Sequence, residues 1–298
     1  TAMRSAEKKP MTFTFLKFVE PEEESEVVSR EFNKIDFFKY DKPNKQWNSI
    51  SQDEFLRDDN SILFVHGFQS NHDCFDSLAE KLRDNLNNTF YAIDYKTNPV
   101  PDMVIINQIP SISEIGSKLS DIVRDKNIHF DIIAHSMGGL VSRSAIEEYR
   151  LNLKVNKIIT LGTPHDGIDI GVLLKILAFK WKEYYSDSKE YLDKILNSQI
   201  KDMTKYCGLN GDKNTFIKDL NAPSYNYSPR YYSMIGIDST NEKPFINIAV
   251  EQITKLLLLG YEHDGLVISS SAGYNLSNEG LSFESTEFEL NHEYICHS

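Results

Sequence analysis

The sequence predicts an α/β fold in which a mostly parallel central sheet carries helices on both faces. Apolar runs of five to seven residues, such as 61–65 and 155–161, alternate with segments of helical periodicity. Such runs are typical of parallel strands that are buried on both faces. With 298 residues, of which 40% are hydrophobic and 26% are charged, the chain is long enough for one large domain, and we expect a single domain over 1–298.

Charge and cysteine content exclude several classes of protein. The formal net charge of −12, from 32 basic and 44 acidic residues, argues against sequence-independent binding to nucleic acid, so no nucleic-acid partner is expected. With only three cysteines, at positions 74, 207 and 296, a disulfide framework is not expected. Zinc-type, EF-hand and HExxH patterns do not occur, so neither a metal nor another cofactor is predicted.

The first residues, TAMRSAEKKP, contain neither an initiating Met nor an apolar signal segment. We expect residues 1–12 to be flexible and the native start to be missing. The compartment therefore stays open, with a secreted or membrane-associated protein favoured. No stretch reaches the roughly 20 apolar residues that span a bilayer.

The elements of the first half follow in order. Residues 13–18 and 27–40 are predicted to form two strands ahead of the first strongly apolar strand, 61–65. A helix follows, since apolar residues at spacings of three and four form one face, namely Phe75, Leu78, Leu82 and Leu86. A strand over 89–95 and a helix over 113–126 come next.

The second half repeats the pattern with one long interruption. A strand over 129–134 leads into a helix, and a further strand covers 155–161. After the interruption, we expect a strand over 231–237, an apolar helix over 246–259 and a strand-like run over 285–290.

The segment 134–138, AHSMG, has the small-x-Ser-x-Gly form and lies between a strand and a helix. A strand that turns sharply into a helix holds the central serine in a strained conformation, and only small residues fit two positions away on either side. This turn projects the Ser136 hydroxyl into solvent and lets the Met137 N–H point at an oxyanion. The pattern predicts Ser136 as a catalytic nucleophile, with a purely structural turn as the alternative.

Four segments together resemble the α/β-hydrolase lipases and esterases of bacteria and the related GPI inositol-deacylase-like enzymes. They are HGF at 66–68, AHSMGGLVSR at 134–143, LGTPHDG at 161–167 and HDGLVISSSAG at 263–273. The resemblance covers roughly 60–298 and implies an α/β-hydrolase fold with a helical lid insertion. Ala134 replaces the commoner glycine of the serine turn, as in the small bacillus-type lipases, and alanine is still small enough for the turn.

The base and the acid should follow the serine in the order Ser, Asp or Glu, His. The histidines late enough to be the base are His263, His292 and His297. His292 is favoured because it lies in a loop just after the run 285–290, and because a similar Asn-His pair carries the base in the lipases that the chain resembles.

Two aspartates are candidates for the acid that orients the base. Asp264 lies in a segment similar to the acid-bearing loop of these lipases, whereas Asp238 follows the strand 231–237 at a position that other hydrolases of this fold use. Asp264 is favoured, and its task would be to fix the tautomer of His292 and stabilise its charged form.

The loop after the strand 61–65 is expected to provide the second donor of the oxyanion hole. The resemblance points to the backbone N–H of Phe68, with Gly67 giving the backbone the freedom to aim it. We interpret His66 and His165 as structural hydrogen-bonding residues and not as catalysts.

The long interruption, residues 165–221, predicts a lid or cap insertion. Its first part, 168–181, has ten apolar residues in fourteen, too few to span a membrane and too many to be left in water. We expect a lid or acyl-chain wall, with a buried core helix as the alternative, and the resemblance implies a helix within 200–221, before the next core strand. The predicted lid residues are Ile168, Leu173, Leu174, Leu177, Phe179 and Trp181.

These features predict a serine carboxylester hydrolase, a lipase or esterase that cleaves acyl esters of lipids through an acyl-enzyme on Ser136. His292, Asp264 and the N–H groups of Phe68 and Met137 complete the predicted site. An acyltransferase or a phospholipase with the same triad is the nearest alternative. A non-catalytic protein that binds a lipid or a partner is the alternative from another class. The expected partners are the ester substrate and, transiently through the lid, a lipid interface.

Overall fold

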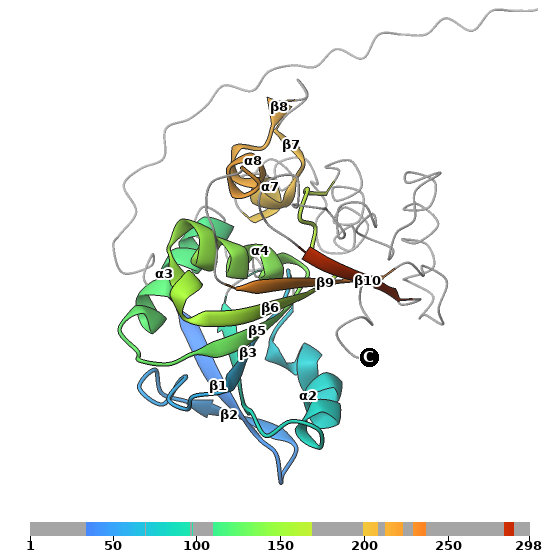
Figure 1. The fold of residues 1–298 in the computed structure, drawn as a ribbon. Coiled ribbons are helices and arrows are strands. Elements are labelled where there is room, and N and C mark those ends of the chain that lie inside the picture. The colour runs from blue at the N-terminus through green and yellow to red at the C-terminus, as the bar shows by residue number, and fades with distance from the viewer. Residues whose placement is uncertain are drawn as a thin grey trace, which may run out of the picture.

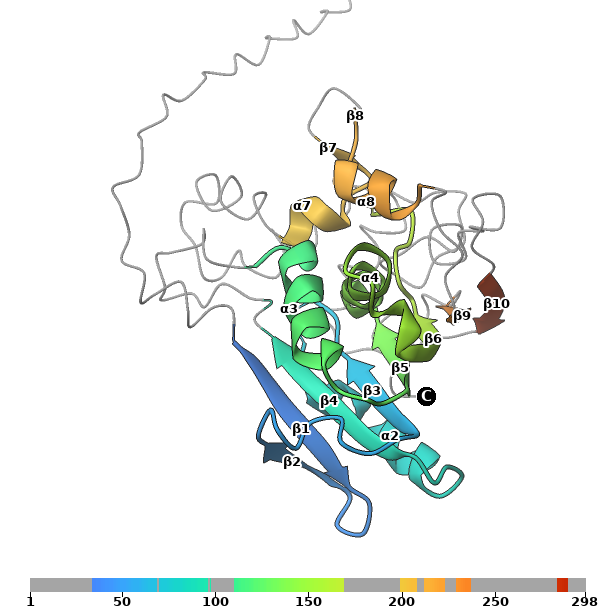
Figure 2. The same cartoon turned by 60° about the vertical axis from the view of Figure 1, so that its left-hand side comes forward.

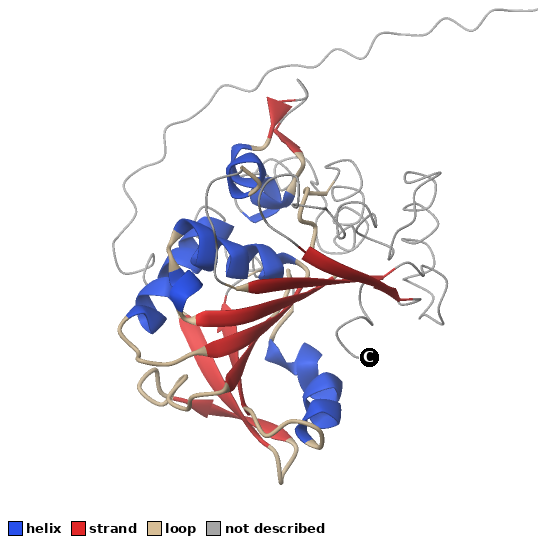
Figure 3. Cartoon of the chain, viewed as in Figure 1, coloured by secondary structure: helices blue, strands red, loops and turns tan. Residues whose placement is uncertain are grey.

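The computed structural model describes residues 34–68, 70–95, 97, 110–168, 199–207, 212–222, 229–236 and 283–288. Within these residues, an eight-stranded sheet has the order β10-β9-β6-β5-β3-β4-β1-β2 (Figure 1). Helix α2 covers one face of the sheet and α3 and α4 cover the other (Figure 3). The predicted α/β architecture, with a mostly parallel sheet and helices on both faces, is confirmed.

Six strands of the sheet run parallel to one another. β3 is buried at all five positions, as expected for a strand with helices on both sides. Three of the six have the predicted bounds, and the other three differ from the prediction by one or two residues. The parallel strands are β3 (Ser61–Val65), β4 (Thr89–Tyr95), β5 (Phe130–His135), β6 (Val155–Leu161), β9 (Arg230–Gly236) and β10 (Phe283–Phe288).

The other end of the sheet is an antiparallel hairpin. β1 (Ile35–Asp41) pairs with β4, and β2 (Gln46–Ile50) pairs with β1 as the edge strand. The region 27–40 was predicted as strand, but β2 was not, because an exposed edge strand shows little apolar alternation. The predicted strand 13–18 and the predicted helix 246–259 lie outside the described residues.

Local sequence explains where the helices begin. Ser111 caps α3 (Ile112–Arg124), because its hydroxyl accepts from the Glu114 N–H while the Glu114 carboxylate accepts from the Ser111 N–H. α2 (Asp76–Arg83) follows a 3-10 turn, η1 (His72–Phe75). α4 (Met137–Arg143) continues into a π-helical turn, η3 (Ser144–Glu148), and then a 3-10 turn, η4 (Leu151–Leu153).

Two apolar cores, one on each face of the sheet, hold the helices in place. The larger one packs α3 and α4 against the sheet and includes Leu119 and Leu140. The smaller one lies under α2 and includes Phe64, Phe75 and Phe90. Each of these side chains is fully buried, which contributes about 1.5 to 3 kcal/mol of transfer free energy.

The described part of the predicted insertion is a separate helical layer. It contains α7 (Gln199–Met203), α8 (Thr215–Leu220) and a small hairpin of β7 (Tyr206–Cys207) and β8 (Asp212–Lys213). The Asn214 side chain joins the two helices, since its Nδ2 donates to Lys201 O at 2.6 Å and to Asp202 O and Thr204 O at 2.9 Å. This layer lies at the opposite end of the described structure from the β1–β2 hairpin (Figure 2).

The helix expected before the next core strand is therefore present as two short pieces. Gly208 and Gly211 fall between them in the sequence, and glycine disfavours a continuous helix. None of the helices in the described ranges is both long enough and apolar enough to cross a membrane.

Candidate active site

Ser136 occupies a strained turn between β5 and α4. Its φ is 51° and its ψ is −124°, a conformation that a residue other than glycine adopts only where the surroundings hold it, at a cost of about 1 to 3 kcal/mol. The Ser136 N–H donates to Leu161 O at 2.9 Å, and Ser136 O accepts from the Thr163 hydroxyl at 2.9 Å. The end of β6 and the loop after it thus hold the turn that the small-x-Ser-x-Gly pattern predicts.

Two glycines make this turn possible because they leave room for neighbouring backbone. A Cβ on Gly138 would lie 2.2 Å from Val65 O and 2.5 Å from His66 O. A Cβ on Gly67 would lie 2.9 Å from the Cβ of Ser136, so the loop after β3 packs directly against the serine. Gly67 does not have a positive φ, so close approach and not backbone freedom is the reason for glycine there.

His66 controls the direction of the peptide that carries the Phe68 N–H. Its Nε2 lies 3.3 Å from the Tyr95 N–H and accepts from it, so the proton is on Nδ1, which donates to Gly67 O at 2.8 Å. Burial lowers the pKa of His66 to about 4 and keeps the ring neutral. In a trans peptide the C=O and the N–H point in opposite directions, so holding Gly67 O also aims the Phe68 N–H.

The pattern predicts that Ser136 projects into open solvent, but in the structure the residue is covered. The residue is 4% exposed, since Gly67 lies against its Cβ and the Thr163 hydroxyl binds its carbonyl. The Met137 side chain is fully buried, while its backbone N–H is at the first position of α4. The first N–H groups of a helix have no partner within the helix and are suited to binding an anion.

Parallel strands bring several predicted site segments to one edge of the sheet. The carboxyl ends of β3, β5, β6, β9 and β10 share this edge because these strands run in the same direction. β9 ends two residues before Asp238, and β10 ends four residues before His292. Asp238 and His292 themselves lie outside the described residues. So do the predicted acid, the alternative bases and most of the predicted lid residues: Asp264, His263, His297, Leu173, Leu174, Leu177, Phe179 and Trp181.

Ile168 is the one predicted lid residue within the described ranges. Its side chain is 5% exposed and belongs to the larger core. Its N–H donates to Met203 O at 2.8 Å, and its carbonyl accepts from the Lys205 N–H at 2.9 Å. Ile168 and residues 203–205, which are far apart in the sequence, therefore lie side by side.

A buried ion pair that the sequence patterns did not predict lies behind the serine turn. Arg143 is fully buried, with its Nε 2.8 Å from Glu147 Oε1 and its Nη2 3.0 Å from Glu147 Oε2. The same guanidinium donates to Asn221 Oδ1 at 3.0 Å and to Leu220 O at 2.8 Å. The helix that follows Ser136 is thereby joined to the end of α8.

His165 extends this network towards the sheet. Burial, together with the nearby guanidinium of Arg143, lowers the pKa of His165 well below its ordinary value and keeps the ring neutral. Its Nδ1 lies 3.4 Å from Arg143 Nη1, and its Nε2 lies 3.0 Å from the Thr160 hydroxyl. These contacts agree with the prediction that His165 is a structural hydrogen-bonding residue.

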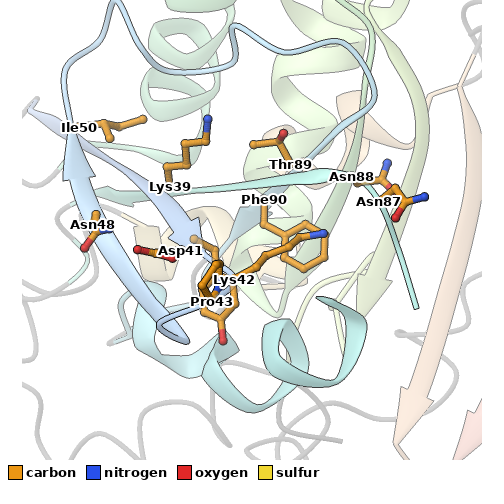
Figure 4. Close-up of a pocket in the computed structure, with 11 residues that line it drawn as sticks. Lys39, Asp41, Lys42, Pro43, Asn48, Ile50, Asn87, Asn88, Thr89 and Phe90 are labelled. Atoms are coloured by element: carbon orange, nitrogen blue, oxygen red, sulfur yellow. The ribbon is translucent and has the colours of Figure 1, made fainter. Parts of the chain in front are cut away.

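A pocket of about 480 Å³ lies beside the β1–β2 hairpin, and Figure 4 shows the residues that line it. The end of β1 and the start of β4 line it, with Lys39, Lys42, Asn87 and Phe90 among the contributing side chains. The start of β4 is at the amino edge of the sheet, opposite the edge that carries the serine turn. The Lys42 ammonium donates to Leu86 O at 2.6 Å and lies over the Phe90 ring, so it is already engaged within the protein.

The described residues here include the Ser136 hydroxyl, the N–H of Met137 at the start of α4, and the N–H of Phe68, which follows the Gly67 that packs against the serine. This set suits acyl transfer, in which a nucleophile attacks a carbonyl and N–H donors stabilise the oxygen that becomes negative. Across the residues that the structure describes, His, Cys, Asp and Glu side chains form no group suited to a metal ion.

Comparison with known proteins identifies the family. The sequence profile of the palmitoyl protein thioesterase family matches residues 61–294. A search of the curated proteins finds no match to the chain.

Among solved structures, the mature form of a Bacillus licheniformis lipase has 19% sequence identity and a TM-score of 0.52, over 80% of this chain and 87% of that chain. A phospholipase from Legionella pneumophila has 14% identity and a TM-score of 0.47, over 72% of this chain and 45% of that chain. The first likeness shows the fold, and the profile covers most of the chain. The chain therefore belongs to the palmitoyl protein thioesterase family, a family of α/β-hydrolases.

Proposed function

We propose that the protein is a serine hydrolase that cleaves acyl esters of lipids through an acyl-enzyme on Ser136. The observation that carries the proposal is the strained turn of Ser136, held against Gly67 next to the peptide of Phe68. A backbone strain of about 1 to 3 kcal/mol persists only where the surrounding structure maintains it, and such residues cluster at active sites. The family match supports hydrolysis of an acyl group.

In the proposed reaction, the Ser136 oxygen attacks the acyl carbonyl while His292 takes the serine proton. The N–H groups of Phe68 and Met137 stabilise the oxyanion, and loss of one such donor typically lowers kcat by about 100- to 1,000-fold. His292 then protonates the leaving group, and a water molecule activated by the same residue releases the acid. Asp264 orients His292 in this scheme.

Acyl thioesters are a second candidate substrate class, favoured by the family to which the chain belongs. The attacked carbonyl is the same, and only the leaving atom changes from oxygen to sulfur. Turnover of p-nitrophenyl butyrate and of butyrylthiocholine, measured side by side, distinguishes the two classes. Added alcohol as an acceptor tests the acyltransferase alternative, since a transferase would form a new ester.

We further propose that residues 1–298 form one domain, with 165–221 as a lid or cap over the site. The contacts of Ile168 with 203–205 support this, because a segment that starts and ends at one place is readily added to a domain. The lid would provide a wall for the acyl chain and a transient contact with a lipid interface.

The Ser136→Ala variant tests the nucleophile. We expect kcat to fall by about 10,000-fold or more, with little change in melting temperature, because a triad member is lost with little volume. Ser120→Ala is a matched control, since Ser120 is also a buried serine but bonds Tyr149 O from α3. Activity of Ser136→Ala above about a tenth of wild type would contradict the role of Ser136. A wild-type protein without turnover would favour the binding-protein alternative.

A pair of variants tests the acid. Asp264→Asn should lower kcat far more than Asp238→Asn, because only the carboxylate bonded to His292 controls its tautomer. The opposite order would assign the role to Asp238, which follows the end of β9 by two residues.

A further inference from the structure

We propose that Asp94 is a positioning residue for the oxyanion hole: it anchors the far end of the loop that carries the Phe68 N–H. The inference rests on the proposed function, in which Phe68 is an oxyanion donor. Asp94 is the next-to-last residue of β4, which pairs with β3 directly before the loop.

The near end of the loop is held by Tyr95, the residue after Asp94. The Tyr95 N–H donates to His66 Nε2, and the Tyr95 hydroxyl donates to His66 O. The two rings are stacked, with centroids 4.2 Å apart and planes 13° apart. This grip fixes His66, which in turn holds the carbonyl of Gly67.

The far end of the loop is held by both oxygens of the Asp94 carboxylate. Oδ1 accepts from the backbone N–H of His72 at 2.7 Å, and Oδ2 accepts from its ring Nδ1 at 2.7 Å. The His72 ring also stacks on Phe38 of β1, with centroids 3.7 Å apart and planes 17° apart, and meets Trp47 of β2 edge-on. The main chain and the side chain of His72 are therefore both fixed to the sheet.

Anchors at both ends matter because an oxyanion donor must be placed accurately. A shift of about 1 Å in a positioned group can lower the rate by about 100-fold. Phe68 lies between two anchors that belong to adjacent residues of one strand, so the loop takes its position from β4. Loss of the Asp94 anchor would remove the attachment of the loop to β4 at His72 and leave the attachment at His66.

The charge of His72 adds a dependence on pH. Burial disfavours the imidazolium, but the hydrogen bond and charge of Asp94, with Asp73 and Asp76, outweigh burial and raise the pKa of His72 above its ordinary value. Asp73 approaches Nε2 at 3.1 Å. Of the elements packed on the ring, β1 and β2 face it with Phe38 and Trp47, which are uncharged.

Two further groups lie close to the carboxylate that holds His72. His66, neutral by virtue of its low pKa, lies 3.7 Å from Asp94 Oδ1. Asp36 lies opposite Asp94 across β1 and β4 and is itself paired with Lys34 at 2.7 Å. A raised pKa means that the ionic part of the grip is complete below the ordinary pKa of histidine and is lost as the pH rises through the raised value. The neutral ring retains the Nδ1–H donor, so the loop loosens without being released.

Kinetics of Asp94→Asn on p-nitrophenyl butyrate, with Asp58→Asn as the matched control, test the proposal. The amide NH₂ of the new Asn would face the donor on His72 Nδ1, so we expect kcat to fall about 10- to 100-fold and KM to change less than about threefold. Asp58 accepts from Lys39 of β1 and from the Tyr91 hydroxyl of β4, away from the loop. Asp58→Asn should therefore keep the wild-type kcat.

Two variants of His72 separate positioning from general stability. In His72→Asn the side-chain amide can replace Nδ1–H as a donor but carries no charge. We therefore expect this variant to keep most of the wild-type kcat and to lack the loosening of the loop at higher pH. In His72→Ala neither feature remains, and kcat should fall as in Asp94→Asn. Amide hydrogen exchange of the peptides spanning 66–72 should speed up in Asp94→Asn and His72→Ala and stay unchanged in Asp58→Asn.

Equal kcat for Asp94→Asn and Asp58→Asn, or equal exchange over 66–72, would overturn the proposal. Failure of the proposed function looks different: either wild type has no turnover or Ser136→Ala retains it. In that event the exchange measurement still decides whether Asp94 holds the loop.

Discussion

Arg143→Met probes whether the ion pair behind the serine turn stabilises the fold. Arg143 is fully buried and the side chain of Glu147 is 3% exposed, so the substitution leaves a buried carboxylate without its cation. Removal of one partner of a buried pair typically costs about 3 to 5 kcal/mol, because the other charge keeps its desolvation penalty. This is a large part of a total free energy of unfolding that is typically about 5 to 15 kcal/mol.

Equilibrium unfolding in urea at pH 7 measures the effect. We expect a lower midpoint with an unchanged slope, and a fall in melting temperature of roughly 6 to 20 °C for a chain of this size. Because Glu147 titrates, the loss of unfolding free energy in Arg143→Met should depend on pH. Burial raises the pKa of Glu147 even in the presence of Arg143, so without the guanidinium it takes up a proton more readily. The loss should therefore be smallest at low pH and grow as the pH rises through that raised pKa.

The double variant Arg143→Met with Glu147→Leu is the control. It removes both charges and fills the space with apolar groups, so it should recover at least about 1 kcal/mol relative to Arg143→Met. A loss below about 1 kcal/mol in the single variant, or a double variant less stable than the single one, would refute the assignment of the cost to an unpaired buried charge.

Three further predictions concern the turn, the helical layer and the lid. Gly138→Ala brings a Cβ to 2.2 Å from Val65 O, so the turn must shift; we expect a loss of about 1 to 3 kcal/mol in urea unfolding and a lower kcat. Burial raises the pKa of Asp202 to about 6, so its contribution to stability is complete below about pH 4 and is lost as the pH rises through 6. In Asp202→Asn the melting temperature should therefore depend less on pH over this range. An unchanged pH dependence would contradict the role of Asp202. Leu174→Ser and Phe179→Ser should lower turnover of long-chain or micellar esters more than of p-nitrophenyl butyrate; equal losses on all substrates would argue against a lid, and unfolding would indicate core.

Strand prediction succeeded where burial on both faces leaves a clear apolar run, as in β3 and β4. It failed for β2, whose residues face solvent and depend on β1 for pairing. The serine turn was predictable because its strain restricts the residues at 134–138 locally. Backbone freedom was the wrong reason for glycine at position 67. The actual reason, its close contact with Ser136, could not be predicted because it joins two loops that are distant in the sequence.

The networks around the turn could not be predicted, because their members meet only after the sheet has formed. Asp94 and His72 are 22 positions apart, and Arg143 and Asn221 are 78 apart. The spacing of Arg143 and Glu147 by four residues is a local signal of a helical pair, and it could have been noticed. The roles of Ser136, Asp264, His292, Phe68 and Met137 stay predictions, as does the lid.

The antiparallel hairpin offers a practical site for modifying the protein. The tip between β1 and β2, at Pro43, Asn44 and Lys45, is exposed, and it lies at the amino edge of the sheet. A fluorescent label or a purification tag inserted there would be separated from Ser136 by the length of the strands, and exposed turn tips tolerate insertions well. The hairpin is therefore a suitable point of attachment to a solid support that leaves the serine edge facing the solution.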